Sequence, residues 1–212
     1  MHHSPASIGV YPRLFEASLF VLFMAASFLV STAVVALAEI GDKTQLLALL
    51  LTTRFRRPLP IIAGILFATL ANHAAAGLAG EWLAGRMEAQ TLRWLIGGSL
   101  LAIAAWTLRP DTLNETRARA GRYGVFIVTL VAFFLVEMGD KTQIATVVLA
   151  AQYQALVAVV LGTTLGMMIA NVPVVLVGNA LAEHIPLRAV RIIAALLFTV
   201  LGVLALSGVG TI

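Results

Sequence analysis

The sequence predicts an all-α membrane protein with six transmembrane helices, built as two three-helix repeats of inverted topology. Three observations predict it: long apolar stretches, few charges, and an acidic motif that occurs twice. Of the 212 residues, 60% are hydrophobic and 11% are charged, and the mean hydropathy is +0.98. Soluble domains carry roughly 25% charged residues, so this composition excludes a soluble enzyme and a disordered chain. The absence of cysteine excludes a disulfide scaffold and thiolate metal sites.

Six apolar stretches are long enough to cross roughly 30 Å of hydrocarbon, which requires about 20 residues. Short polar or proline-containing segments separate them. The expected spans are residues 26–52, 59–80, 91–108, 124–151, 155–182 and 189–208. This divides the chain into an N-terminal extension over 1–25, a first repeat over 26–110, a cytoplasmic linker over 111–122 and a second repeat over 123–212. An interfacial helix is one form that the N-terminal extension can take.

The first apolar region, from Ala17 to Thr53, is too long for one straight spanning helix, since it would extend about 55 Å. Three explanations compete: a separate interfacial helix at residues 14–25, a broken first helix, or a cleaved signal sequence. Met1 to Tyr11 contains no Lys or Arg, which disfavours a signal sequence. We favour an interfacial or overhanging extension.

The arginines predict the orientation, because cytoplasmic loops carry an excess of basic residues. Nine arginines follow expected spans 1, 3 and 5, from Arg54 to Arg191, whereas three lie on the opposite side. We therefore expect a multi-pass membrane protein with the central loop in the cytoplasm and both termini outside. The pI of about 10.1 reflects these scattered arginines, so no nucleic-acid partner is expected.

The segment Glu39-Ile40-Gly41-Asp42-Lys43-Thr44-Gln45 returns 98 positions later as Glu137-Met138-Gly139-Asp140-Lys141-Thr142-Gln143. Ala71-Asn72 returns 99 positions later as Ala170-Asn171. Each half then holds three spans, and this odd number places the second half upside down relative to the first. Inverted repeats are typical of secondary transporters, whose substrate sites lie near the membrane midplane.

The two motifs contain both lysines and four of the ten acids of the chain, and all six charges fall within expected spans. Charges inside a bilayer usually mark ion pathways. Glu39 and Asp42 share a helix face, whereas Thr44 points away unless Gly41 interrupts the helix. The expected cation ligands are Glu39, Asp42, Gln45, Glu137, Asp140 and Gln143. The expected supporting or coupling residues are Lys43, Thr44, Lys141, Thr142, Asn72 and Asn171.

An all-oxygen set of this kind suits hard divalent cations such as Ca²⁺ or Mn²⁺. Four acids and two lysines leave two negative charges in excess, which one divalent cation or two protons would neutralise. Cation and protons would therefore compete for the same carboxylates. The expected partners are the cation, protons and the lipid bilayer; the metal is cargo, and no cofactor or enzymatic activity is expected.

Other interpretations remain open at this point. The motifs can be structural, with Glu39–Lys43 and Glu137–Lys141 as ion pairs within one helix, and the two asparagines can form hydrogen bonds between helices. His73 is interpreted as a packed polar residue. The acids can form a cation-selective ring in a channel. The two aspartates can belong to an intramembrane aspartyl protease, although a proton-sharing dyad does not require the neighbouring Glu and Lys.

The duplicated Glu-x-Gly-Asp-Lys-Thr motif resembles that of the Gdt-type cation transporter family, which includes MneA-type bacterial manganese exporters. The residues that match are Glu39, Gly41, Asp42, Lys43 and Thr44, and Glu137, Gly139, Asp140, Lys141 and Thr142. The resemblance covers the chain from about Ala26 onward, and the short central linker is similar to that of bacterial members. It implies a divalent cation/proton antiporter of the inner membrane that exports Mn²⁺, with Ca²⁺ as the alternative cargo and Na⁺ as an alternative coupling ion.

Overall fold

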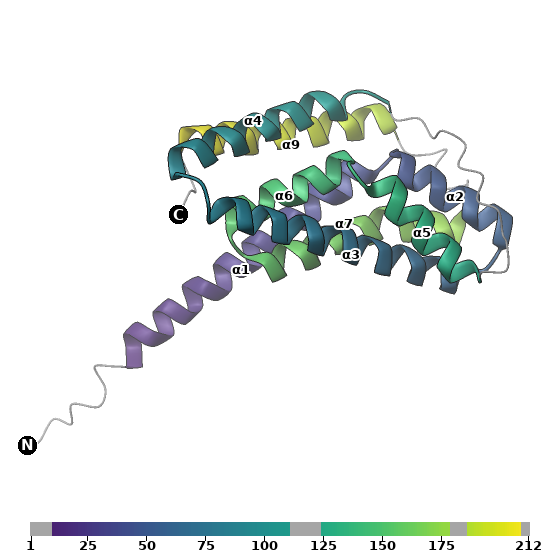
Figure 1. Ribbon diagram of the computed structural model, residues 1–212, viewed down its shortest axis with the longest axis horizontal. Helices are drawn as coiled ribbons and strands as arrows, with labels where there is room; N and C mark the ends of the chain where they lie inside the picture. The colour runs from purple at the N-terminus through teal and green to yellow at the C-terminus, as the bar shows by residue number, and fades with distance from the viewer. Residues whose placement is uncertain (1–9, 111–123, 179–185, 209–212) are drawn as a thin grey trace, which may run out of the picture.

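The computed structural model describes residues 10–110, 124–178 and 186–208, and within each of these ranges most residues lie in α-helices. The expected linker over 111–122 lies outside the described residues. The helices are α1 Val10–Glu39, α2 Lys43–Phe55, α3 Pro58–Ala84, α4 Ala89–Thr107, α5 Val125–Glu137, α6 Lys141–Tyr153, α7 Leu156–Val177 and α9 Leu187–Ser207 (Figure 1).

Four of the described helices are long and apolar enough to cross a membrane, and α5 is a shorter apolar helix. These four segments are Glu16–Glu39, Pro58–Ala84, Leu156–Val177 and Leu187–Ser207. The expected spans over 26–52 and 124–151 are each divided into two helices at the acidic motif. The all-α membrane class is therefore confirmed, and the count of six crossings stays a prediction.

The long first apolar region is a broken helix. A single helix, α1, runs without interruption from Val10 to Glu39 and is followed by α2 after a break at residues 40–42. The alternative of a separate helix at residues 14–25 is therefore wrong, because these residues belong to α1. The N-terminal part of α1 projects beyond the other helices and so forms an overhang (Figure 1). Its placement at the membrane interface stays a prediction.

The two halves of the chain repeat their local structure with an offset of 98 residues. The helix starts that correspond are Lys43 and Lys141, Pro58 and Leu156, and Ala89 and Leu187. Arg56 and Gln154, which end α2 and α6, share the same offset and the same left-handed backbone, with φ of 52° and 47°. The duplication seen in the motif thus extends to helix boundaries.

Helices of the two halves pack against each other in a matching way. Helix α1 lies along α7, α3 lies along α5, and α4 lies along α9. A Cβ on Gly162 of α7 would approach the Phe28 carbonyl oxygen of α1 to 2.5 Å, and a Cβ on Gly64 of α3 would approach the Phe126 carbonyl oxygen of α5 to 2.9 Å. These close approaches require glycine, as is common between membrane helices.

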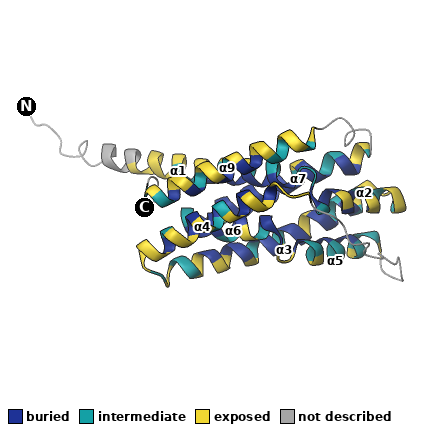
Figure 2. Cartoon of the chain, turned by 90° about the horizontal axis from the view of Figure 1, so that it is seen from above, coloured by how far each residue is buried: buried dark blue, intermediate teal, exposed yellow. Residues whose placement is uncertain are grey.

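Figure 2 shows buried and exposed residues alternating along the helices, with the exposed ones on their outer sides. Many of the exposed residues are large and apolar, and many of the buried ones are polar or charged. Phe67 and Leu165, for example, are exposed, whereas Thr69, Asn72 and Asn171 are buried. A protein surrounded by lipid tolerates this distribution, since apolar surface is not penalised there and buried polar groups find partners inside.

Candidate cation-binding site

Both acidic motifs interrupt a helix at their glycine. Helix α1 ends at Glu39, and Gly41 takes a φ of 80° before α2 begins at Lys43. Gly139 takes a φ of 73° at the corresponding break between α5 and α6. Positive φ is readily adopted by glycine, which explains the motif's glycine in physical terms. The local unwinding that the sequence made conditional on Gly41 is therefore present.

The glutamine of each motif folds back onto its own break. The Gly41 N–H donates a hydrogen bond of 2.9 Å to Gln45 Oε1, and the Gly139 N–H donates one of 2.7 Å to Gln143 Oε1. Gln45 Nε2 also donates to the Ala170 carbonyl oxygen at 3.0 Å. In this conformation the glutamines stabilise the breaks, and their expected role as cation ligands stays a prediction.

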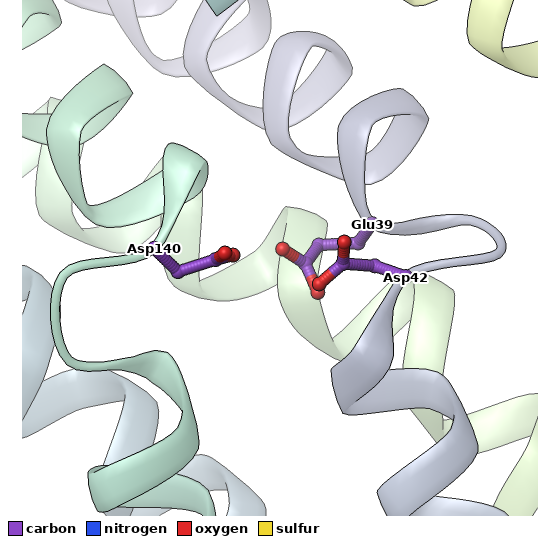
Figure 3. A group of neighbouring side chains, drawn as sticks. All are labelled: Glu39, Asp42 and Asp140. Carbon is purple, nitrogen blue, oxygen red and sulfur yellow. The ribbon is translucent and has the colours of Figure 1, made fainter. Parts of the chain in front are cut away.

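The two breaks bring three carboxylates together. Glu39, Asp42 and Asp140 each offer one oxygen, and these oxygens lie within 4.8 Å of one another. All three residues are at most 1% exposed. Figure 3 shows Glu39 and Asp42 extending from the first motif, with Asp140 pointing toward them from the second. This carboxylate cluster, formed by both halves, contains three of the four acids that the sequence singled out.

The lysines connect the motifs crosswise. Lys43 Nζ lies 2.9 Å from Asp140 Oδ1, and Lys141 Nζ donates a hydrogen bond to Asp42 Oδ1. These lysines therefore do not form the alternative ion pairs, Glu39–Lys43 and Glu137–Lys141, within one helix. Because each helix is broken between the glutamate and the lysine, the i,i+4 geometry of a continuous helix is lost. With both lysines counted, the carboxylate cluster retains one negative charge in excess.

The threonines bind carboxylates of their own motif. Thr44 Oγ1 donates to Glu39 Oε2, while Thr142 Oγ1 donates to Asp140 Oδ2 at 3.3 Å. Glu39 Oε1 is buried and has no hydrogen-bond partner among the described residues. A carboxylate oxygen buried in this way is costly unless something binds it, which makes Glu39 a suitable cation ligand.

Glu137 is held by α3 rather than by the carboxylate cluster. Its Oε2 accepts hydrogen bonds from Asn72 Nδ2 at 3.1 Å and Thr69 Oγ1 at 3.4 Å, and its Oε1 lies 3.0 Å from His73 Nε2. Asn72 thus contacts a motif acid, and its expected supporting or coupling role stays a prediction. The expectation that Glu137 is itself a cation ligand stays a prediction.

Asn171 takes a different position from Asn72. Its Nδ2 donates to the Met167 carbonyl oxygen at 3.0 Å, within its own helix. By the 98-residue offset of the helix starts, Asn171 is the counterpart of His73 in the second half. The sequence comparison, with its offset of 99, had made it the counterpart of Asn72. His73 and Thr69 are the site residues that the sequence did not identify. The one available signal was that His73 is the only histidine within an expected span.

These features define a class of protein: a multi-pass helical membrane protein with a buried acidic cluster where two broken helices meet, as in secondary transporters. The chain belongs to the family described as divalent cation/proton antiporter GDT1, which matches residues 27–115 and again residues 125–210. The family is one of transporters and not of enzymes, and it places this chain among cation transport proteins.

Relatives from bacteria and plants match most of the chain. A protein of Vibrio cholerae serotype O1 named "Putative manganese exporter" is 52% identical over 170 residues, which cover 80% of this chain and 84% of the relative. A GDT1-like protein of Synechocystis is 27% identical, covering 86% of this chain and 97% of the relative. GDT1-like protein 3 of Oryza sativa is 27% identical, covering 92% and 75%. No solved structure matches the chain.

Proposed function

We propose that the protein exports Mn²⁺ across the bacterial inner membrane in exchange for protons. The observation that carries the proposal is the carboxylate cluster of Glu39, Asp42 and Asp140, which is buried and drawn from both motifs. Oxygen ligands alone suit hard divalent cations, and the described cluster contains no nitrogen or sulfur ligand. The choice of Mn²⁺ over Ca²⁺ rests on the name of the Vibrio relative.

Proton exchange follows from the charge of the site. The cluster with its two lysines has one negative charge in excess, and a divalent cation would reverse that sign. That count takes every carboxylate as ionised. Protons that occupy these carboxylates in the absence of the cation must leave when it binds and can return when it is released, so cation and protons compete for one site. The family description, which names divalent cation/proton antiport, supports this coupling.

Alternating access is proposed to use six crossings in two inverted halves. The 98-residue offset of the helix starts, the crosswise packing of α1 on α7 and α3 on α5, and the two separate family matches support this arrangement. In each half we take the two helices joined at the motif as one crossing. The central loop is proposed to be cytoplasmic and both termini outside, because the arginines favour this orientation.

Purified protein in proteoliposomes tests the proposal directly. With an imposed pH gradient and a pH-sensitive dye inside, Mn²⁺ is expected to move protons in the opposite direction and to saturate. Asp140→Asn and Glu39→Gln are expected to lose at least about 90% of this exchange, since each removes a cluster carboxylate. Exchange at wild-type rates by either variant would contradict the proposal.

The same assay separates the alternatives. Ca²⁺ supplied in place of Mn²⁺ identifies the Ca²⁺/H⁺ antiporter, and an imposed Na⁺ gradient identifies Na⁺ coupling. Cation flux without proton movement, rising without saturation, indicates a channel. In the cell, a strain that lacks the protein is expected to grow poorly in Mn²⁺ and to recover with the wild-type gene but not with the Asp140→Asn gene.

A further inference from the structure

The two glutamates of the duplicated motif have different surroundings. Both motifs break the helix in the same way, and in both the aspartate N–H donates to the glutamate carbonyl oxygen at 3.0 Å. Yet Glu39 contributes an oxygen to the carboxylate cluster, whereas Glu137 is not among the three members found in the described part of the chain. At the two breaks the Glu, Gly and Asp residues are the same and Ile40 and Met138 differ, so the residues that surround each glutamate are the other candidate source of this difference.

The residues that bind Glu137 lie on one face of α3. Thr69, Asn72 and His73 are spaced i, i+3 and i+4, which puts them side by side on a helix. All three are at most 1% exposed. Together they contact both oxygens of Glu137, with His73 alone among them at Oε1. This set is placed to hold the glutamate side chain in one direction.

Helix α7, which occupies the matching position against α1, does not repeat this set. Residues 98 and 99 positions beyond His73 are Asn171 and Val172, and those beyond Thr69 are Met167 and Met168. The Asn171 side chain donates to its own helix at Met167, and among the described residues no hydrogen bond joins it to Glu39. One glutamate therefore has an imidazole partner, and the other has none from the corresponding helix position.

We propose that His73 is a positioning residue that holds Glu137 out of the cation site, so that Glu39 serves the cation in this conformation and Glu137 enters only after it leaves His73. The proposal rests on the function proposed above, for it assumes that the carboxylate cluster binds the transported cation. It assigns the different surroundings of Glu39 and Glu137 in the two motifs to one side chain on α3.

A matched pair of variants isolates the contact. His73→Asn introduces the residue that stands 98 positions later, and its shorter side chain does not extend to the position of Nε2. His73→Gln is one methylene longer and can place an amide N–H there. In His73→Asn, Asn72 and Thr69 still donate to Glu137 Oε2, but Oε1 loses its partner and can turn toward the cluster, where a fourth carboxylate strengthens divalent cation binding.

The measurements are Mn²⁺ titration of the purified protein and transport in proteoliposomes. His73→Asn is expected to lower the Kd for Mn²⁺ about tenfold, to lower KM, and to reduce the maximal rate because release is slower. His73→Gln is expected to restore Kd and rate to within about twofold of wild type. In a Glu137→Gln background, His73→Asn is expected to leave Kd unchanged, because no fourth carboxylate remains.

Several results would overturn the inference while leaving the proposed function intact. One is a Kd for Mn²⁺ that is unchanged in His73→Asn while the wild type transports Mn²⁺. Another is that His73→Asn shifts the Kd equally in the wild-type and Glu137→Gln backgrounds, which would indicate a general structural effect. If His73→Asn does not fold, the single variants decide: Glu39→Gln is expected to weaken Mn²⁺ binding about tenfold more than Glu137→Gln, and equal losses refute the asymmetry. Absence of Mn²⁺ binding by the wild type refutes the proposed function instead.

Discussion

Lys43 and Asp140 form an ion pair of 2.9 Å although they belong to different motifs, one in each half of the chain. Its counterpart joins Lys141 to Asp42. The two pairs differ in burial, since the Lys43 side chain is 23% exposed and that of Lys141 is 4% exposed. The ion pair is thus repeated in the two halves, but the two lysine side chains are buried to different degrees.

Removal of the more buried lysine is expected to be more damaging. Lys141→Met leaves a buried aspartate without its lysine and is expected to lower stability by about 3–5 kcal/mol, the range for one partner lost from a buried pair. Lys43→Met is expected to cost less, because the Lys43 side chain is less buried than that of Lys141. Thermal unfolding in detergent measures both. The double variant Lys141→Met/Asp42→Asn should recover part of the loss, and no recovery would indicate that Lys141 acts otherwise.

The glycines at the two breaks offer a matched comparison. Gly41→Ala and Gly139→Ala each force alanine into a positive φ, at about 1–2 kcal/mol. A Cβ on Gly41 would also approach Leu187 Cδ2 to 2.8 Å, whereas a Cβ on Gly139 meets nothing within 4 Å. Gly41→Ala is therefore expected to have the lower Tm. The reverse order would contradict the packing of α9 on the first break.

The glycine in the α1–α7 contact is expected to tolerate no larger residue. Gly162→Val would press against the Phe28 carbonyl, and overpacking of this kind costs about 1–3 kcal/mol. Gly98→Val is the control, since a Cβ at Gly98 meets nothing within 4 Å. The Tm of the two variants in detergent gives the comparison. Equal Tm values would argue against close packing of α1 and α7.

Thr44 is expected to matter more for transport than Thr142. Its hydroxyl orients Glu39 in the carboxylate cluster, whereas the Thr142 hydroxyl is 3.3 Å from Asp140 and contributes a weaker bond. Thr44→Val should reduce the exchange rate about tenfold, while Thr44→Ser, which keeps the hydroxyl, should retain it. Thr142→Val should reduce it less. An active Thr44→Val with an inactive Thr44→Ser would rule out this role.

Bound cation is expected to stabilise the folded protein. At a Mn²⁺ concentration about one hundred times its Kd, binding adds about 2.7 kcal/mol to the free energy of unfolding. The Tm should therefore rise with Mn²⁺ and fall again when EDTA removes it. Asp140→Asn should show little of this rise, because it lacks one carboxylate of the cluster. An equal rise in that variant would place the cation elsewhere.

The sequence predicted the apolar helices and the offset of 98 residues, and it pointed to Gly41 as the place where the helix could unwind, because hydropathy and glycine chemistry act locally. It did not predict that Lys43 pairs with Asp140, since that contact depends on how the halves meet in space. The role of His73 was missed for a related reason. A histidine without a duplicate carries no local pattern, and only the packing of α3 on α5 brings it to Glu137.

The crosswise ion pairs also bear on how the chain is assembled during synthesis. The first half enters the bilayer carrying Asp42 and Lys43, and the residues that form ion pairs with them are added about a hundred residues later. Until then, those charges depend on water, lipid headgroups or the insertion machinery. We therefore expect stable integration of the first half to depend on the arrival of the second.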